Sequence, residues 1–330
     1  MMEIRRIKLG EGTIFENPLV IYKINSEMAL RYSKLIIKYL LNKKMIQKIS
    51  VQKETYEFFE ELTTEENQNK LIIFNNKDKI DICITIGGDG TVLWCNSMFP
   101  IEYQRPPFLT FNLGTLGYMT YYDCDMYRDV LDELLNHKES DHISYEKRST
   151  LKCKFISVDE NEETETESFI ALNDIIFERR EEGNMISLEV YINNEPLTSV
   201  KGDGLIISTS TGSTAYSLSS GGTIIHYDVD CLLLNAKCPH SLSFRALVFP
   251  RDIDLKILMG QDSYPEALVV KDGISKVKRK IKQGIEVSLS DKFCNMIIIE
   301  KFISLPIKVW RQKLIDQLGW NSKFKNTGLK

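Results

Sequence analysis

The chain has 330 residues, of which 43% are hydrophobic and 27% are charged, and these values are typical of a soluble globular protein with room for two domains. The net charge of −4 gives no basic excess, which argues against binding to nucleic acid or to an anionic membrane surface. No apolar run approaches the ~20 residues that a membrane-spanning helix needs, and residues 1–8 have no hydrophobic signal core.

The cysteines and histidines do not form a recognisable metal or disulfide pattern. The seven cysteines are scattered, their number is odd, and no CxxC pair occurs. The four histidines do not form an HExxH motif. We therefore predict reduced thiols in a cytoplasmic protein, without a structural zinc site.

Strand and helix patterns alternate over the first 136 residues. Ser26 is predicted to cap a helix that begins near Glu27. This rhythm predicts a Rossmann-like α/β domain, in which helices cover a parallel sheet. The predicted strands are 19–24, 46–51, 71–74, 82–86 and 108–112, and the predicted helices are 27–44, 55–62, 92–99 and 125–136.

Strand patterns dominate from about residue 150 onward. The acidic run 159–167 reads as a solvated hairpin loop, and 193–196 as a turn. An amphipathic helix at 307–318 is expected to dock on the first domain. We predict an N-terminal α/β domain (1–146, joined by the C-terminal helix 304–330) and a C-terminal mainly β domain (147–303). Strands are predicted at 151–156, 169–178, 185–192 and 204–209, with several more between 232 and 301.

A glycine-rich turn follows the apolar strand 82–86 and precedes a predicted helix. Its sequence is Gly87-Gly88-Asp89-Gly90-Thr91, and this strand–turn–helix order is typical of phosphate sites. Asp89 would hold Mg²⁺ or accept a proton from an attacking hydroxyl. A plain turn in which Asp89 caps the helix is the alternative.

A second glycine-rich turn, residues 113–118, follows the strand 108–112. Because ligands gather at the carboxyl ends of parallel strands, this turn is expected to flank the first across one crevice. A simple strand–helix connection, without a ligand, would have the same sequence pattern.

Two polar stretches in the second half are candidate ligand sites. The hydroxyls of Thr211, Ser213 and Thr214 lie in a glycine-broken turn after a strand and would donate to phosphate or ribose oxygens, although an ordinary loop is possible. Asn173-Asp174 interrupts an apolar strand, so at least one of the two points inward and needs a partner, either a sugar hydroxyl or a backbone group.

Neither GxxxxGK[ST] nor a GxGxxG that opens a βαβ unit occurs in the sequence. A P-loop and a dehydrogenase-type dinucleotide site are therefore not indicated. A phosphate-binding turn with a central aspartate instead suggests a kinase that uses an acidic base together with Mg²⁺.

Taken together, these blocks resemble the NAD kinase family over residues 80–321. The blocks are Gly87–Thr91, Asn112–Tyr118, Leu172–Asp174 and Gly202–Tyr216, and Cys238–Arg245 and the tail Trp310…Trp320-Asn321 are similar to the eukaryotic branch. The resemblance implies ATP- and Mg²⁺-dependent phosphorylation of the 2′-hydroxyl of the adenosine ribose of NAD, with Asp89 as proton acceptor. It also implies a cleft between two domains and a homo-oligomer (dimer or tetramer) whose NAD site takes in part of a neighbouring subunit.

The resemblance further implies a set of substrate-contacting residues. Two of them depart from the family, which usually has Asn-Glu where this chain has Asn173-Asp174, and often Arg in place of Lys201. The predicted set is Gly88, Asp89, Gly90, Thr91, Tyr118, Asn173, Asp174, Lys201, Asp203, Thr211, Thr214, Ala215, Tyr216 and Ser219.

Two alternatives stay open. A lipid kinase of the diacylglycerol or sphingosine type shares the glycine turn, but the hydroxyl-rich stretch 208–220 argues against a deep apolar pocket for an acyl chain. A non-catalytic dinucleotide sensor is supported only by the altered Asp174.

Overall fold

The computed structural model describes residues 6–8, 14–114, 117–136, 143–159, 162–180, 184–264, 266–280, 283–303 and 306–318. The described residues form two compact units, each treated by itself below. We call the first the α/β unit; it lies within Arg6–Cys95, Pro106–Glu146 and Met296–Lys330. We call the second the β unit; it lies within Asn96–Arg105 and Lys147–Asn295. As a proposal, we retain the domain boundaries predicted from the sequence, which are 1–146 with 304–330 for the first domain and 147–303 for the second.

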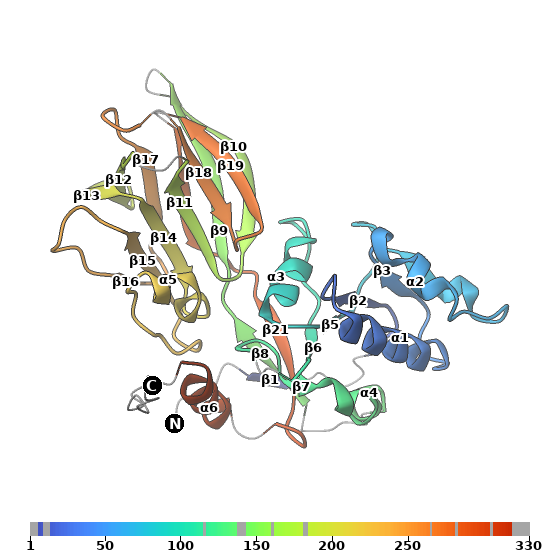
Figure 1. The fold of residues 1–330 in the computed structure, drawn as a ribbon. Coiled ribbons are helices and arrows are strands. Elements are labelled where there is room, and N and C mark those ends of the chain that lie inside the picture. The colour runs from blue at the N-terminus through green and yellow to red at the C-terminus, as the bar shows by residue number, and fades with distance from the viewer. Residues whose placement is uncertain are drawn as a thin grey trace, which may run out of the picture. The chain divides into compact units, whose positions relative to one another are not determined.

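The α/β unit is built on one sheet with the strand order β1-β8-β21-β6-β5-β2-β3-β4, and β7 also pairs with β6 (Figure 1). The pairs from β21 through β6, β5, β2 and β3 to β4 are parallel, which confirms the predicted parallel sheet. Its strands are β1 (Arg6–Lys8), β2 (Pro18–Tyr22), β3 (Ile49–Val51), β4 (Leu71–Ile73), β5 (Ile82–Ile86), β6 (Phe108–Asn112), β7 (Tyr122–Asp123), β8 (Ile143–Arg148) and β21 (Cys294–Ile299).

Three helices, Glu27–Leu41, Glu57–Glu60 and Tyr127–Leu135, contribute buried side chains to the apolar core of this sheet. Ser26 caps α1 as predicted, because its Oγ accepts from Ala29 N at 3.2 Å. The rings of Tyr39 on α1 and Tyr127 on α4 pack edge to face, with their centroids 6.2 Å apart. The helices are α1 (Glu27–Leu41), α2 (Glu57–Glu60), α3 (Asp89–Ser97), α4 (Tyr127–Leu135) and α6 (Pro306–Leu318), with 3₁₀ turns at η1 (Lys53–Thr55), η2 (Gln68–Lys70) and η3 (Cys124–Met126).

The β unit contains two six-stranded antiparallel sheets, which confirms its predicted mainly β character. Their orders are β10-β9-β20-β17-β12-β13 and β16-β15-β14-β11-β18-β19, and side chains from both sheets form one apolar core. Its elements are β9 (Leu151–Asp159), β10 (Glu162–Ala171), β11 (Asp174–Arg179), β12 (Ile186–Ile192), β13 (Glu195–Gly202), β14 (Gly204–Thr209), η4 (Gly212–Thr214), α5 (Tyr216–Ser219), β15 (Cys231–Lys237), β16 (Leu247–Pro250), β17 (Leu255–Met259), β18 (Glu266–Lys271), β19 (Ser275–Lys280) and β20 (Gln283–Leu289).

Several bounds differ by a few residues from the predicted elements, for example the helix predicted over 27–44, which ends at Leu41. Three further differences concern α3, β10 and β11. The helix predicted over 92–99 begins earlier, at Asp89, because the glycine turn itself forms its first turn. The strand predicted over 169–178 is interrupted between Ala171 and Asp174. The loop predicted over 159–167 is wrong in extent, since β10 already begins at Glu162; residues 160–161 lie outside the described residues.

Two further observations bear on the class of protein. All seven cysteines are free thiols, and all but Cys238 are buried. Within the described ranges, no helix is both long and apolar enough to cross a membrane.

Candidate active site

The glycine turn after β5 leads directly into α3. A Cβ at Gly87 would lie 2.3 Å from Oγ1 of Thr91, so only glycine allows the helix to start this close to the strand. Gly88 and Gly90 differ, because a Cβ at either position would meet no atom within 4 Å. The turn therefore leaves open space beside its backbone, where a phosphate could approach the helix N-terminus.

Asp89 is held by the second glycine-rich turn. Its Oδ2 accepts from Tyr118 N at 2.8 Å and its Oδ1 accepts from Met119 N at 2.9 Å. A Cβ at Gly117 would lie 2.2 Å from Asp89 Oδ1, so glycine is needed where the turn meets the carboxylate. The two turns thus lie against each other, as predicted. Both carboxylate bonds go to Tyr118 and Met119, at the end of the second turn, instead of to α3, which argues against the helix-cap interpretation.

The Gly117–Tyr121 turn is itself firmly held. Thr120 Oγ1 accepts from Gly117 N at 2.8 Å, and Thr110 Oγ1 donates to Met119 O at 2.8 Å. Burial, and secondarily the charge of Asp89, raises the pKa of Tyr118. Each Asp89 oxygen keeps a lone pair beyond the one used by the turn. The half-buried carboxylate can therefore still accept a hydrogen bond from a ligand hydroxyl.

In the β unit, Asn173 and Asp174 lie where the chain passes from β10 to β11. The carboxylate of Asp272 accepts from the backbone N–H groups of Leu172 at 2.9 Å, Asn173 at 2.7 Å and Asp174 at 3.2 Å. These three amides bind a side chain instead of a neighbouring strand, which explains the interruption of the predicted strand. The sequence did not single out Asp272; its only local signal is the Asp272-Gly273 pair, and both residues have positive φ.

The hydroxyl-rich turn after β14 packs on Asn173. Thr209 N donates to Asn173 O at 2.9 Å, and a Cβ at Gly212 would lie 2.1 Å from that oxygen. Among the described residues, the buried side-chain atoms without a hydrogen-bond partner include three from these two stretches, namely Asn173 Oδ1, Thr211 Oγ1 and Ser217 Oγ. Buried polar atoms normally have partners, so this cluster is a place where a polar ligand would bind.

Three of the predicted residues lie toward the other end of β14. Asp203 precedes this strand and Thr211 follows it, and its six residues extend about 20 Å. Asp203 forms a bidentate ion pair with Arg179, with Nε–Oδ1 at 2.8 Å and Nη2–Oδ2 at 3.3 Å. Lys201 is exposed on β13. The Tyr216 ring lies 5.5 Å from Nζ of Lys237, whose carbonyl accepts from Asp203 N.

The predicted residues thus fall into three groups. Gly88, Asp89, Gly90, Thr91 and Tyr118 lie in the α/β unit. Asn173, Asp174, Thr211 and Thr214 lie together in the β unit, where Thr214 Oγ1 donates to Thr211 O at 3.1 Å. Lys201, Asp203 and Tyr216 form the third group. Ala215 precedes Tyr216, the first residue of α5, and Ser219 is the last residue of that helix.

Asp174 gives the β unit a distinctive pH dependence. It is 4% exposed; burial, and secondarily the charge of Asp272, raises its pKa from the ordinary 3.8 to about 7. Between these values the folded protein binds more protons than the unfolded chain, so stability falls as the pH rises through this window. We expect Asp174→Asn to remove this loss and to stabilise the protein at pH 8 by up to about 4 kcal/mol relative to the parent chain.

Urea unfolding of both proteins at pH 5 and pH 8 measures this effect. Asp262→Asn, at an exposed position of the β unit, is the matched control and should follow the parent chain at both values. If the free energy of unfolding depends on pH in the same way in the parent chain and in Asp174→Asn, then Asp174 does not titrate in this range.

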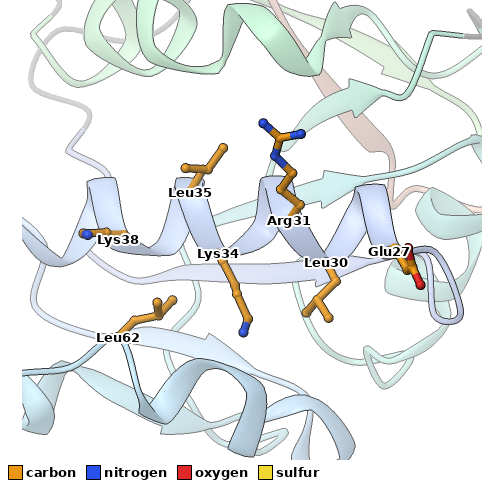
Figure 2. Close-up of a pocket in the computed structure, with 7 residues that line it drawn as sticks. All are labelled: Glu27, Leu30, Arg31, Lys34, Leu35, Lys38 and Leu62. Atoms are coloured by element: carbon orange, nitrogen blue, oxygen red, sulfur yellow. The ribbon is translucent and has the colours of Figure 1, made fainter.

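A separate hollow of about 390 Å³ lies on α1 (Figure 2). Leu30, Leu35 and Leu62 form its apolar lining, and the other lining residues are the charged side chains of Glu27, Arg31, Lys34 and Lys38. None of the residues predicted from the sequence lines this hollow, and we do not assign the reaction to it.

Comparison with known proteins identifies the family of the chain. A family model described as the ATP-NAD kinase N-terminal domain matches residues 18–139. A second model, described as the ATP-NAD kinase C-terminal domain, matches residues 172–299. The chain belongs to the NAD kinase family. The predicted resemblance to the NAD kinase family and the predicted fold class are therefore confirmed.

Several relatives within the NAD kinase family show the extent of the similarity. A probable NAD kinase 1 from Oryza sativa subsp. japonica is 37% identical over 229 residues, which make up 69% of this chain and 41% of the relative. A mitochondrial NADH kinase, pos5, from Schizosaccharomyces pombe is 35% identical over 253 residues, which make up 76% of this chain and 62% of the relative. The chain thus spans less than two thirds of the length of these relatives.

Solved structures agree with the fold. A yeast NADH kinase complexed with NADH has a TM-score of 0.83 at 27% identity, and the match covers 96% of this chain and 91% of that one. An NAD kinase from Archaeoglobus fulgidus in complex with ATP has a TM-score of 0.61 at 19% identity, and the match covers 89% of this chain and 98% of that one. At this identity the similarity supports the fold alone.

Proposed function

We propose that this chain is an NAD kinase that transfers the γ-phosphoryl group of ATP to the 2′-hydroxyl of the adenosine ribose of NAD, giving NADP. The observation that carries the proposal is the Asp89 carboxylate at the end of β5, held by two backbone amides beside the open space at Gly88 and Gly90. Family membership supports the same reaction, and the lipid kinase alternative has no support among the relatives.

The mechanism assigns Asp89 the role of proton acceptor. A ribose hydroxyl is a poor nucleophile at neutral pH, so a carboxylate within hydrogen-bond reach assists its attack on the γ-phosphorus. Backbone N–H groups of the glycine turn at the start of α3 would stabilise phosphoryl oxygens without reorganisation. Positioning of the two substrates supplies much of the remaining acceleration.

Magnesium fits this site as part of the nucleotide substrate. Among the described residues, no group of three or more His, Cys, Asp or Glu side chains is placed to hold a metal ion. Mg²⁺ commonly binds through one or two carboxylates together with substrate phosphates, and Asp89 is the carboxylate of the glycine turn. When bound with ATP, Mg²⁺ would neutralise phosphate charge.

The binding residues are proposed to be those predicted from the sequence. The partnerless Asn173 Oδ1 and Thr211 Oγ1 support hydrogen bonds to the dinucleotide. Asp174 is proposed to replace the glutamate of the family. The use of residues from both units in one reaction rests on the resemblance.

A homo-oligomer, either a dimer or a tetramer, is part of the proposal. Strand β16 is the edge of its sheet, and the segment around it exposes Leu242 (92%), Val248 (47%) and Leu247 (38%). An apolar edge strand of this kind favours association. A second copy that supplied Lys201 and Asp203 would also explain why β14 separates these two residues from Thr211. We propose a cytoplasmic location, which the free buried thiols support.

One assay tests the proposed reaction. The purified full chain is incubated with ATP, Mg²⁺ and either NAD or NADH, and the product is measured with an NADP-specific dehydrogenase. We expect NADP or NADPH to form in an ATP-dependent manner. NAD binding without turnover would favour the sensor, and phosphorylation of diacylglycerol in a parallel reaction would favour the lipid kinase; either result contradicts the proposal.

A further inference from the structure

A buried lysine of α6 contacts the turn that holds Asp89. Lys313 is 2% exposed, and its Nζ donates to Tyr118 O at 3.1 Å and to Thr120 O at 3.4 Å. The same ammonium lies 4.1 Å from the centroid of the Tyr121 ring. Burying an ammonium is costly unless it is well hydrogen-bonded, so its position is closely tied to these carbonyl groups.

The geometry of one peptide group connects Lys313 to Asp89. The carbonyl of Tyr118 and the N–H of Met119 belong to the same planar peptide bond, and in a trans peptide they point in opposite directions. Lys313 binds the oxygen of this peptide, and Asp89 Oδ1 accepts from its N–H at 2.9 Å. A cation on one side and an anion on the other both favour the same orientation and polarise the group.

We propose that Lys313 is a positioning residue, which orients the Tyr118–Met119 peptide and thereby fixes the Asp89 carboxylate in its reactive position. The inference rests on the proposed function for the role of Asp89. All of these residues lie in the α/β unit. The C-terminal helix would then serve the reaction without touching the substrates.

Lys313→Met tests this role, because methionine keeps an unbranched side chain of similar length but cannot donate. We expect kcat to fall about 10- to 100-fold, the scale of a misplaced catalytic group, while KM for NAD stays within about twofold. In an Asp89→Asn background the same substitution should lower the residual rate no further, since it acts through Asp89. Gln312→Met, an exposed neighbour on the same helix, is the matched control and should change neither quantity.

Hydrogen exchange gives a readout that does not depend on catalysis. We expect Lys313→Met to speed exchange of the Tyr118 and Met119 amides, with little change at β2 or α1. If Lys313→Met does not fold, Lys313→Gln, which retains a neutral donor, takes its place with the same expected direction. Unchanged kcat or unchanged exchange at these amides would overturn the inference. An inactive parent chain would contradict the proposed function, whereas the exchange measurement would still test the contact.

Discussion

Asp89→Asn is expected to lower kcat for NAD phosphorylation by about 10²- to 10⁴-fold, the range associated with loss of a general base. The amide cannot accept the proton of the ribose hydroxyl. It also offers only one carbonyl oxygen to the two amides of Tyr118 and Met119. Because the remaining contacts to the dinucleotide are proposed to lie elsewhere, the dissociation constant of NAD should change by only a few fold.

Steady-state kinetics and calorimetric NAD titrations separate these two quantities. Asp129→Asn provides the control, since Asp129 is an exposed aspartate on α4 of the same unit and should leave both values unchanged. If Asp89→Asn turns over at the parent rate with ATP and Mg²⁺, the proton acceptor is another group. If it loses NAD binding as well as turnover, Asp89 contributes mainly to affinity.

Asp272→Ala is expected to destabilise the β unit by at least about 3 kcal/mol. The substitution leaves the N–H groups of Leu172, Asn173 and Asp174 without their acceptor, and a buried unsatisfied donor costs about 1–3 kcal/mol. Alanine is also disfavoured at this position because φ of Asp272 is +46°. The released backbone carries Asn173 and Asp174, so KM for NAD should rise as well.

Asp272→Asn is the informative comparison. Asparagine tolerates positive φ and keeps one acceptor oxygen, and it removes the charge that helps to raise the pKa of Asp174. Urea unfolding should therefore rank the parent chain and Asp272→Asn well above Asp272→Ala. Equal stability of the alanine and asparagine variants would mean that the three amides find other partners.

The parts of this molecule that follow from local patterns were predictable. Strand β5, strand β6 and the Ser26 cap depend on residues close together in the chain, so apolar runs and capping preferences were sufficient. The two glycine turns were identified for the same reason. Their contact followed from the rule that carboxyl ends of adjacent parallel strands share one edge of the sheet.

The features that were not predicted from the sequence depend on partners distant in the chain. Asp272 binds amides 98 to 100 residues away, and Lys313 binds carbonyls 193 and 195 residues away. Helical periodicity assigns a lysine to solvent, and only the tertiary structure shows that this one is buried. Asp203 was predicted as a ligand contact, and no local sequence pattern indicated its ion pair with Arg179.

The place of β21 in the sheet has a consequence for biosynthesis. This strand, Cys294–Ile299, lies between β8 and β6, whose residues precede it by more than a hundred positions. Until the ribosome has made residue 299, the sheet beside the Asp89 turn has a gap with two unpaired edges. Such edges are slow to close and prone to wrong pairing. The nascent chain must therefore grow by more than a hundred residues beyond β8 before this sheet is complete.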